Sequence, residues 1–317
     1  MSTFQKEKEN IKLKLSIIVL NYNGYEDTIE CLESLKRTNF HDLDVTIIVI
    51  DNGSTNESVS NITKWMINNY EKYSVIDDFE SEVMEITLFC SKDNKGFSGG
   101  NNIGIILSKR IQEDYILMLN NDTVVDENFL LPLVETAEAD KTIGIVGAEI
   151  HEYYNHKNFI LGGNLSTVKC SGYHLYNTRI ANRREVTFTS GCIWLVPLNV
   201  IQTCGLLDEN YFLYVEDVDY CYRVVQAGFK IICIEDSIIY HKEGQSTIVK
   251  PTIIYYNTRN RLYFSSKLKK TKIKILCFYF YFLLTRILKI IKNPSTMKYV
   301  KQGYKDYRRN VYGKFQY

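Results

Sequence analysis

Two acidic segments carry the side chains best suited to chemistry. Asp122 follows two asparagines and an apolar stretch, and a carboxylate beside amide oxygens suits a hard divalent ion such as Mg²⁺ or Mn²⁺. Glu216, Asp217 and Asp219 place three carboxylates within four residues at the start of an expected helix. Crowded carboxylates raise one another's pKa, so this segment is suited to supply a general base.

Each of these residues also has an ordinary structural explanation. Asp122 could cap the next helix, and the acidic trio could form a solvated helix start that the helix dipole favours. His241 follows an apolar run and could be a purely structural histidine, a metal ligand or a phosphate contact. Local sequence alone leaves these alternatives open.

The residues between these segments predict the elements that would position them. Continuous apolar strands that alternate with helices indicate a parallel sheet covered on both faces. The second half is predicted as mixed α+β, followed by helices that end at Asn293-Pro294. The predicted strands are 16–20, 45–50, 85–90, 115–120 and 230–234, and the predicted helices are 25–38, 58–69, 101–111, 217–227 and several from about 252 to 291.

Polar residues follow each of the four predicted strands of the first half. An open parallel sheet binds ligands at the carboxyl ends of its strands. Four polar sets at one edge therefore predict a binding cleft, although any one of them alone would be ordinary turn chemistry. The glycine-rich set is neither a P-loop nor GxGxxG, but it precedes a helix whose start suits phosphate oxygens. The sets are Asn21–Gly24, Asp51–Thr55, Asn94–Asn102 and Asn120–Thr123.

The ordered series of these segments resembles glycosyltransferase family 2, the inverting enzymes of the GT-A fold, and especially its rhamnosyltransferase-like branch. The resemblance implies an α/β GT-A fold with a Rossmann-like nucleotide-binding half, a mixed central sheet and C-terminal helices. The matching segments span roughly residues 14–265. They are SIIVLNYNG (16–24), IDNGST (50–55), NKGFSGGNNIG (94–104), LMLNNDT (117–123), SGCIWLVP (190–197), GLLDENYFLYVEDVDYCYR (205–223), YHKEGQST (240–247) and YYNTRN (255–260).

The resemblance further implies roles for the donor side. Residues 120–122 would be the DXD-type element, with Asn120 in place of the usual first Asp, which leaves Asp122 as the main metal ligand. His241 would be a further contact to the metal or the diphosphate. The residues expected to bind the nucleotide sugar are Asn21, Asn23, Asp51, Asn94, Gly96, Gly100, Asn102, Asn120 and Asn121.

On the acceptor side, the resemblance implies that Asp217 is the catalytic base and that Glu216 and Asp219 support it. Gly191 and Trp194 would line the acceptor site, where the Trp194 ring would stack on a sugar. These roles describe an inverting transfer from a UDP- or dTDP-sugar to a hydroxyl of a glycan or lipid-linked acceptor in cell-surface polysaccharide synthesis. A divalent ion, Mg²⁺ or Mn²⁺, would neutralise the leaving diphosphate.

Two alternative functions remain. A sugar-nucleotide pyrophosphorylase-like enzyme would carry a basic, glycine-rich loop after its first strand, where this chain has Asn21–Gly24. A non-catalytic carbohydrate-binding protein would not need Asp122, Asp217 and His241 together. No aromatic and basic recognition module for nucleic acid is recognisable, so no nucleic-acid partner is expected.

The formal net charge of +1 conceals two opposed parts of the chain. The 59 residues from Arg259 onward contain sixteen Lys and Arg and one acid, whereas the preceding 258 contain 22 bases and 36 acids. We therefore predict a GT-A catalytic domain at residues 1–248, with a nucleotide-sugar half at 14–123 and an acceptor half at 124–248. A basic helical region would follow at residues 249–317.

The apolar run at residues 275–284 is too short to span a bilayer. Its basic surroundings predict contact with an anionic membrane surface, with packing or homo-oligomerisation as the alternative. The polar first sixteen residues predict a cytoplasmic protein at the inner face of the cell membrane. Eight cysteines without a CxxC pair predict reduced, buried thiols, and the 45% apolar and 24% charged composition excludes a disordered chain.

Overall fold

The apolar runs of the first half form the parallel part of one sheet. The computed structural model describes residues 12–179, 182–242, 250–268 and 271–315. In it, four parallel strands lie in the spatial order β5-β1-β2-β4, and a short strand, β3 (Tyr73–Ile76), pairs with β4 at the edge. The four are β1 (Lys14–Asn21), β2 (Asp44–Asp51), β4 (Ile86–Cys90) and β5 (Tyr115–Asn120).

The second half completes the sheet beside β5 with strands of both directions. β11 (Ile193–Pro197) runs antiparallel to β5, and β7 (Ile143–Glu152), β12 (Lys230–His241) and β10 (Arg183–Val186) follow it outward. A hairpin of β8 (Asn155–Ser166) and β9 (Ser171–Tyr176) extends from β7, and β6 (Thr123–Val125) pairs with the end of β12. The predicted α/β architecture with a mixed central sheet is confirmed.

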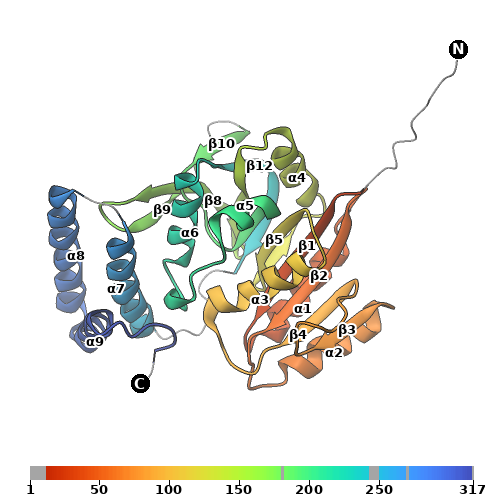
Figure 1. The fold of residues 1–317 in the computed structure, drawn as a ribbon, viewed down its shortest axis with the longest axis horizontal. Coiled ribbons are helices and arrows are strands. Elements are labelled where there is room, and N and C mark those ends of the chain that lie inside the picture. The colour runs from red at the N-terminus through yellow and green to blue at the C-terminus, as the bar shows by residue number, and fades with distance from the viewer. Residues whose placement is uncertain (1–11, 180–181, 243–249, 269–270, 316–317) are drawn as a thin grey trace, which may run out of the picture.

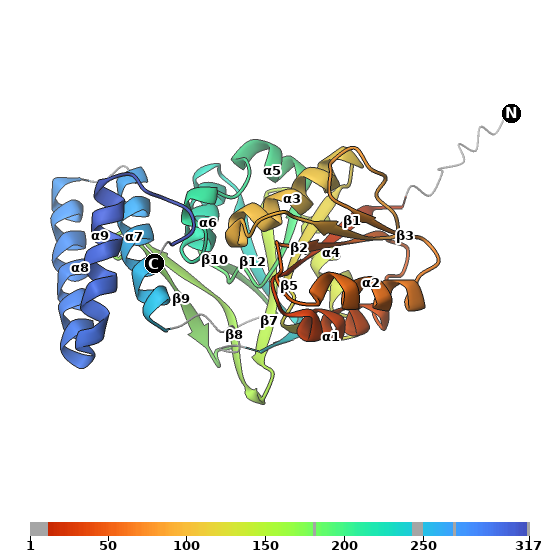
Figure 2. The ribbon, with the colours of Figure 1, turned by 90° about the horizontal axis from the view of Figure 1, so that it is seen from below.

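Helices cover both faces of the sheet, because side chains of the buried strands are apolar on both sides. On β1, Leu15, Ile17 and Val19 belong to one core, and Ile18 belongs to the other. The first core lies under α1 (Tyr25–Lys36), α2 (Ser58–Asn69) and α4 (Leu130–Ala139). The second lies under α3 (Gly96–Arg110), α5 (Leu198–Cys204) and α6 (Glu216–Gln226), on the opposite side in Figure 2.

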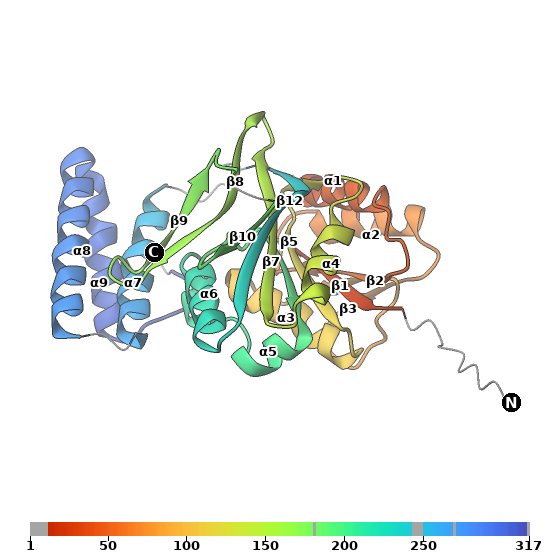
Figure 3. The ribbon, with the colours of Figure 1, turned by 90° about the horizontal axis from the view of Figure 1, so that it is seen from above.

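Three C-terminal helices lie side by side at the end of the sheet opposite β3 (Figures 1 and 3). They are α7 (Lys250–Lys267), α8 (Lys272–Lys292) and α9 (Met297–Arg308). α7 packs on α6, with the Tyr222 and Phe264 rings 5.7 Å apart. The predicted boundary between residues 248 and 249 falls within the segment 243–249, which lies outside the described residues, and it stays a prediction.

Several predicted boundaries differ from the observed ones. α3 begins at Gly96, five residues before the predicted start, because the glycine-rich segment is helical. β12 continues past residue 234 through an irregularity in its pairing with β7 and ends at His241. The helices do not end at Asn293-Pro294, since a short 3₁₀ turn at Pro294–Thr296 leads into α9.

Five of the eight cysteines are buried, as predicted. Cys277 on α8 is exposed instead, and Cys90 and Cys204 are partly buried. Among the described residues, no helix combines the length and the apolar character that crossing a membrane requires.

Candidate functional site

The polar residues that end β1, β2 and β5 lie at one level of the sheet. In the parallel register Asn21 lies opposite Asp51, and Leu20 lies opposite Asn120. The predicted convergence of these strand ends is therefore confirmed. It places amide and carboxylate side chains at the edge where open parallel sheets bind ligands.

Asn21 holds Asp51 and the first turn in place. Its Nδ2 donates to Asp51 Oδ1 at 2.7 Å, and its Oδ1 accepts from the Gly24 N–H at 3.1 Å and from the Thr28 hydroxyl at 3.0 Å. The other Asp51 oxygen accepts from the Ser54 N–H at 3.0 Å. Asn21 is fully buried and engaged at both ends, so it orients Asp51.

Asn23 and Asn121 join the loops around this pair. Asn23 adopts a left-handed φ of 56° and accepts from the Thr55 N–H at 2.8 Å, which ties the loop after β1 to the loop after β2. Asn121 Nδ2 donates to the Gly24 carbonyl at 3.2 Å and to the Thr28 hydroxyl at 3.0 Å. Both asparagines thus shape the edge of the predicted nucleotide site.

The glycine-rich segment serves mainly to pack α3. Asn94 Oδ1 accepts from the Gly96 N–H at 2.8 Å, and the next N–H, of Phe97, donates to the Phe212 carbonyl at 2.7 Å. These first helical donors are therefore used within the protein. At Gly100, an added Cβ would lie 2.4 Å from Leu20 Cδ1, so this glycine allows close helix–strand packing.

Two further asparagines near α3 also have internal partners. Asn102 is buried, and it both donates to the Leu207 carbonyl at 2.9 Å and accepts from the Leu207 N–H at 3.0 Å. Its predicted contact with the nucleotide is not what the structure shows. Asn52, which the prediction omitted although it directly follows Asp51, donates to the Gly96 carbonyl at 2.9 Å.

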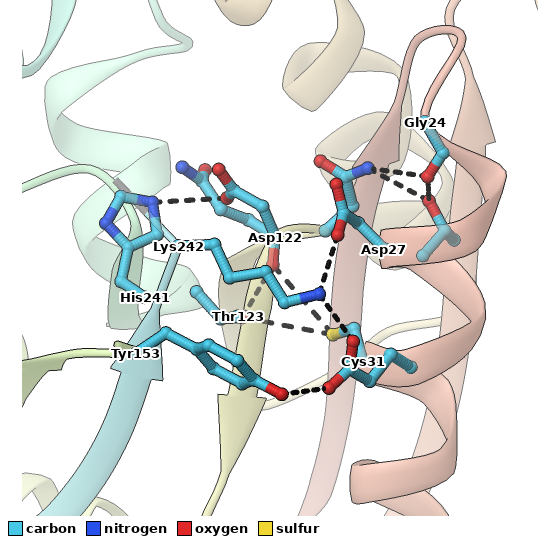
Figure 4. A network of polar contacts seen from close by, with 12 residues as sticks. Gly24, Asp27, Cys31, Asp122, Thr123, Tyr153, His241 and Lys242 are labelled. Atoms are coloured by element: carbon cyan, nitrogen blue, oxygen red, sulfur yellow. Dashed lines mark hydrogen bonds and ion pairs between the residues drawn. The ribbon is translucent and has the colours of Figure 1, made fainter. Parts of the chain in front are cut away.

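Asp122 and His241 meet although they are 119 residues apart in the chain. The antiparallel pairing of β6 with β12 sets His241 opposite Thr123, the neighbour of Asp122. His241 Nε2 lies 3.1 Å from Asp122 Oδ1, and both side chains are partly exposed (Figure 4). The structure thus brings the two predicted metal ligands together.

Lys242 holds together the two segments that carry Asp122 and His241. Its N–H donates to the Asp122 carbonyl at 2.9 Å, and its Nζ donates to Asp27 Oδ1 at 2.6 Å and to Glu30 (Figure 4). Burial alone would lower the pKa of Lys242, but the hydrogen bonds to the two carboxylates outweigh it and raise the pKa. Tyr153 completes the network by donating to Glu30 at 2.6 Å. The prediction missed this network, whose only local signal is a lysine directly after His241.

The donor set suits a divalent ion that is shared with a phosphate ligand. Among the described residues, no group of three or more His, Cys, Asp or Glu could hold a metal ion. One carboxylate and one imidazole at a partly exposed edge leave most coordination positions to other oxygens. Mg²⁺ is usually bound in this way, through one or two carboxylates with substrate phosphates and water. Asp122 and His241 therefore fit an ion that arrives with a diphosphate.

The three acids of α6 occupy different environments. Burial raises the pKa of Asp217 to about 6, and burial together with the neighbouring Asp217 raises the pKa of Glu216. Glu216 Oε2 is buried with no hydrogen-bond partner among the described residues. Asp219 instead lies within 2.8 Å of Arg223 Nε and 2.5 Å of Lys267 Nζ. Its carboxylate is occupied by these cations, and its support of the base stays a prediction.

A turn before β11 connects Asp217 with the end of β5. An added Cβ at Gly191 would lie 3.5 Å from Asp217 Cβ and 3.3 Å from the Phe97 ring. The next carbonyl, of Cys192, accepts from the Asn120 N–H at 2.9 Å. Gly191 therefore sits between the acidic helix and the strand that leads to Asp122.

Trp194 does not lie in the site. Its side chain is fully buried, and its ring stacks on Tyr220 with centroids 5.6 Å apart and an interplanar angle of 21°. The ring offers no exposed face to a sugar. The predicted stacking of Trp194 on an acceptor is therefore wrong.

Comparison with known proteins agrees with this arrangement. The model of the glycosyl transferase family 2 matches residues 16–201 of this chain. The chain belongs to this family. The matched segment includes Asp51 and Asp122 and ends before Asp217 and His241, so the roles of the latter two depend on the geometry described above.

Curated relatives of this family 2 glycosyltransferase include a hexosyltransferase of glycan biosynthesis and a rhamnosyltransferase. It is 23% identical over 247 residues to the low-salt glycan biosynthesis hexosyltransferase Agl10 of Haloferax volcanii, which covers 71% of this chain and 77% of that protein. It is 26% identical over 234 residues to the rhamnosyltransferase WbbL of Escherichia coli, with 68% and 78% covered. The chain is thus rhamnosyltransferase-like, and the pyrophosphorylase and non-catalytic alternatives are not favoured.

Solved structures show that the glycosyltransferase has the GT-A fold. The mannosyltransferase PcManGT of Pyrobaculum calidifontis, solved with GDP-Man and Mn²⁺, aligns with a TM-score of 0.59 at 11% identity, over 95% of this chain and 88% of that one. GalNAc-T7, solved with UDP, GalNAc and Mn²⁺, aligns with a TM-score of 0.57 at 15% identity, over 78% of this chain and 48% of that one.

Proposed function

We propose that the chain is a metal-dependent inverting glycosyltransferase with Asp217 as its catalytic base. The observation that carries this proposal is the convergence of Asp122, His241 and Asp51 at one edge of the sheet, with Asp217 beyond Gly191. The first three suit a nucleoside diphosphate and its cation, and the fourth suits the acceptor hydroxyl. Support for a dTDP-sugar as donor includes a 22% identical relative, the dTDP-rhamnosyl transferase RfbF of Shigella flexneri, and a UDP-sugar is the alternative donor.

Asp217 performs the proton transfer in this proposal. Its carboxylate takes the proton of an acceptor hydroxyl while that oxygen forms a bond to C1 of the donor sugar. The bond from C1 to the diphosphate oxygen breaks on the opposite face, and the diphosphate leaves with the electron pair. The configuration at C1 is therefore inverted. A base whose pKa is about 6 is ionised at neutral pH and still able to accept a proton.

Asp122 and His241 hold the cation side of the site. When bound, Mg²⁺ or Mn²⁺ would neutralise the charge that develops on the departing diphosphate. Lys242 and its two carboxylate partners keep the end of β12 against α1, so the imidazole of His241 stays beside Asp122. Asp51, which Asn21 orients, binds the nucleoside, and Gly191 lines the acceptor side next to Asp217.

We further propose that α8 places the enzyme on an anionic membrane surface, where a lipid-linked glycan acceptor is found. The face of α8 opposite its buried Phe278 and Phe282 is apolar and exposed, with Ile273, Leu276 and Phe280 each more than 70% exposed. Exposed lysines stand at both ends of the helix. Apolar side chains flanked by lysine suit insertion into the headgroup region of an anionic leaflet.

Release of free nucleoside diphosphate tests the catalytic proposal. The purified chain is incubated with UDP-sugars and dTDP-sugars, Mn²⁺ or Mg²⁺, and a bacterial lipid extract as the acceptor source. We expect turnover of at least one donor and a loss of about 10²-fold or more in the Asp217→Asn variant. Asp44→Asn, at the opposite end of β2, is the matched control and should retain activity. The proposal fails if no donor is turned over or if Asp217→Asn is as active as the wild type.

A further inference from the structure

Two buried polar residues of α7 have no part in the function proposed so far. Arg259 and Asn260 are both fully buried, and they belong to the segment YYNTRN (255–260). A buried guanidinium and a buried amide are costly unless every polar atom finds a partner. The partners of these two side chains therefore indicate what the segment does.

The loop that precedes the catalytic helix has a strained backbone. Phe212, Tyr214 and Val215 have φ values of 62°, 67° and 76°, all in the left-handed region that disfavours residues with a side chain. Val215 is β-branched and directly precedes Glu216 and Asp217. Such conformations are unfavourable and persist only where the surroundings impose them.

Asn260 and Arg259 supply that restraint. Asn260 Nδ2 lies 3.0, 2.8 and 2.7 Å from the carbonyl oxygens of Tyr211, Leu213 and Tyr214, to which it donates. Arg259 Nη2 donates to the Tyr211 carbonyl at 2.9 Å, and Arg259 Nε donates to Asn260 Oδ1 at 2.9 Å. Both side chains therefore act on the backbone of the strained loop.

The two residues are themselves held firmly. Arg259 Nη1 donates to the Gly313 carbonyl at 2.7 Å and to the Tyr255 hydroxyl at 3.2 Å. The Tyr255 hydroxyl in turn donates to Asp306 Oδ2 at 2.8 Å, which brings a carboxylate near the buried guanidinium. The far side of the loop is also fixed, since the Phe212 carbonyl accepts from the Phe97 N–H at the start of α3.

We propose that Arg259 and Asn260 are positioning residues of the transfer reaction, which hold residues 210–215 in the strained conformation that presents Asp217 to the acceptor. This inference rests on the proposed role of Asp217 as the base. A purely structural role would stabilise the fold without changing the surroundings of the Asp217 carboxylate. A positioning role makes those surroundings depend on Asn260.

The titration of Asp217 in the full chain tests this difference without a substrate. Aspartate labelled with ¹³C at the carboxyl carbon is incorporated, and the Asp217 resonance is assigned by its loss in Asp217→Asn. Among the described residues, Glu216 and Cys221 have pKa values that the charge of Asp217 raises, and neither carries this label. In Asn260→Leu the loop relaxes and admits water, so the titration midpoint should fall by about one pH unit toward the ordinary value near 3.9.

Asn257→Leu is the matched control. Asn257 lies on the same helix but donates to the Ile253 carbonyl within it at 3.1 Å, away from the loop. We expect this control to leave the midpoint unchanged. The proposal is overturned if Asn260→Leu titrates like the wild type, or if Asn257→Leu shifts the midpoint equally.

A milder variant covers the case in which Asn260→Leu does not fold. Asn260→Ser keeps one hydroxyl donor, and it should shift the midpoint in the same direction by a smaller amount. Once a nucleotide-sugar donor has been identified, kcat of either variant should fall about tenfold or more, while KM for that nucleotide sugar changes less than twofold. If the midpoint shifts but Asp217→Asn remains active, the restraint on the loop holds and the assignment of the base is wrong.

Discussion

Asp217 has surroundings that favour its protonated form. Since burial raises its pKa to about 6, the folded protein binds this proton more tightly than the unfolded chain does. The favourable contribution is present at low pH and is lost as the pH rises from about 4 to 6. At pH 8 the ionised, partly buried carboxylate therefore lowers the free energy of unfolding.

The first prediction follows from the direction in which the Asp217 carboxylate changes stability with pH. Asp217→Asn should raise the free energy of unfolding by about 1–2 kcal/mol at pH 8 and leave it unchanged at pH 3.5. Urea unfolding at both pH values measures the difference. Asp219→Asn is the opposite case, because Asp219 is paired with Arg223 and Lys267. That variant should lose about 2 kcal/mol or more at pH 8. A loss of stability in Asp217→Asn at pH 8 would contradict the argument.

The second prediction concerns the cation. If Asp122 and His241 hold it, then Asp122→Asn and His241→Asn should each weaken the Mn²⁺-dependent binding of UDP or dTDP about tenfold or more. Isothermal calorimetry with and without EDTA measures this affinity. His41→Asn is a fair control, since His41 lies before β2 with a φ of 51° that asparagine tolerates. Equal affinity in all variants, or no effect of EDTA, would remove the metal from the proposal.

The sequence predicted which residue types gather at the site better than where each side chain faces. The family resemblance implies that Asp122 and His241 act at one site, and strand order and register do bring the two side chains together. Asp217 and Asp219 lie two positions apart on a helix, so their side chains point about 160° apart around the axis, which the spacing of acidic residues in the sequence alone does not reveal. Trp194 faces the core because of the pleat of β11, whose phase depends on its partner strands.

The start of α3 depends on a close approach between two elements. Gly96 has a φ of 74°, and a Cβ there would lie 2.2 Å from the carbonyl oxygen of Phe212. Both the backbone conformation and the space therefore require glycine. Gly228, after α6, has a φ of 90°, but among the described residues no atom would lie within 4 Å of a Cβ added there. Substitutions at Gly228 and Gly96 therefore distinguish the cost of backbone strain alone from the cost of backbone strain together with steric contact.

The third prediction uses this pair. Gly228→Ala should cost about 1–2 kcal/mol for the left-handed backbone alone. Gly96→Ala should cost about 1–3 kcal/mol more, because the Phe212 backbone must move, and it should also reduce nucleoside diphosphate release. Thermal or urea unfolding of both variants measures the difference. Equal costs would show that α3 and the loop are not in close contact.

Element prediction succeeded where periodicity was unbroken. The strand at 115–120 and the helix at 58–69 agree with β5 and α2. The sequence predicts the start of α3 five residues too late, because glycine has a low helix propensity. In the structure these glycines let the helix pack closely on β1. The predicted end of β12 at residue 234 is too early. Glu235, Asp236 and Ser237 are typical turn residues, but the strand resumes its pairing with β7 at Ile238.

The whole molecule presents one apolar helix face far from the donor side. Figure 1 shows α8 at the opposite end of the molecule from α2 and β3. Arg286 of α8 is buried and donates to the Thr258 hydroxyl at 3.1 Å, which fixes which face points outward. The outward face carries Ile273, Leu276 and Phe280.

The fourth prediction tests what this face contacts. The full chain should sediment with vesicles that contain phosphatidylserine or phosphatidylglycerol, and binding should weaken at high salt. Replacing Ile273, Leu276 and Phe280 with Ser should reduce binding about tenfold or more. The matched control replaces the exposed Ile67, Tyr73 and Val75, at the other end of the molecule, with Ser.

Two outcomes would contradict membrane contact. If the α8 variant binds vesicles as well as the wild type does, this face is not the membrane contact. If the wild type is a dimer that does not bind vesicles and the α8 variant is a monomer, the face is instead an interface between two copies. Analytical ultracentrifugation of the same proteins separates these cases.

The contact between Arg259 and Gly313 has a consequence for how the enzyme is made. The loop in front of Asp217 is complete only when a side chain from residue 259 and a carbonyl from residue 313 are both present. Domains fold as they emerge during synthesis, beginning with the N-terminal part. The strands of the sheet can therefore pair on the ribosome while Asp217 and the loop in front of it are still unrestrained. A nascent chain restrains the loop in front of Asp217 only after residue 313 has been made, so release before that point gives a folded sheet in which this loop is not held.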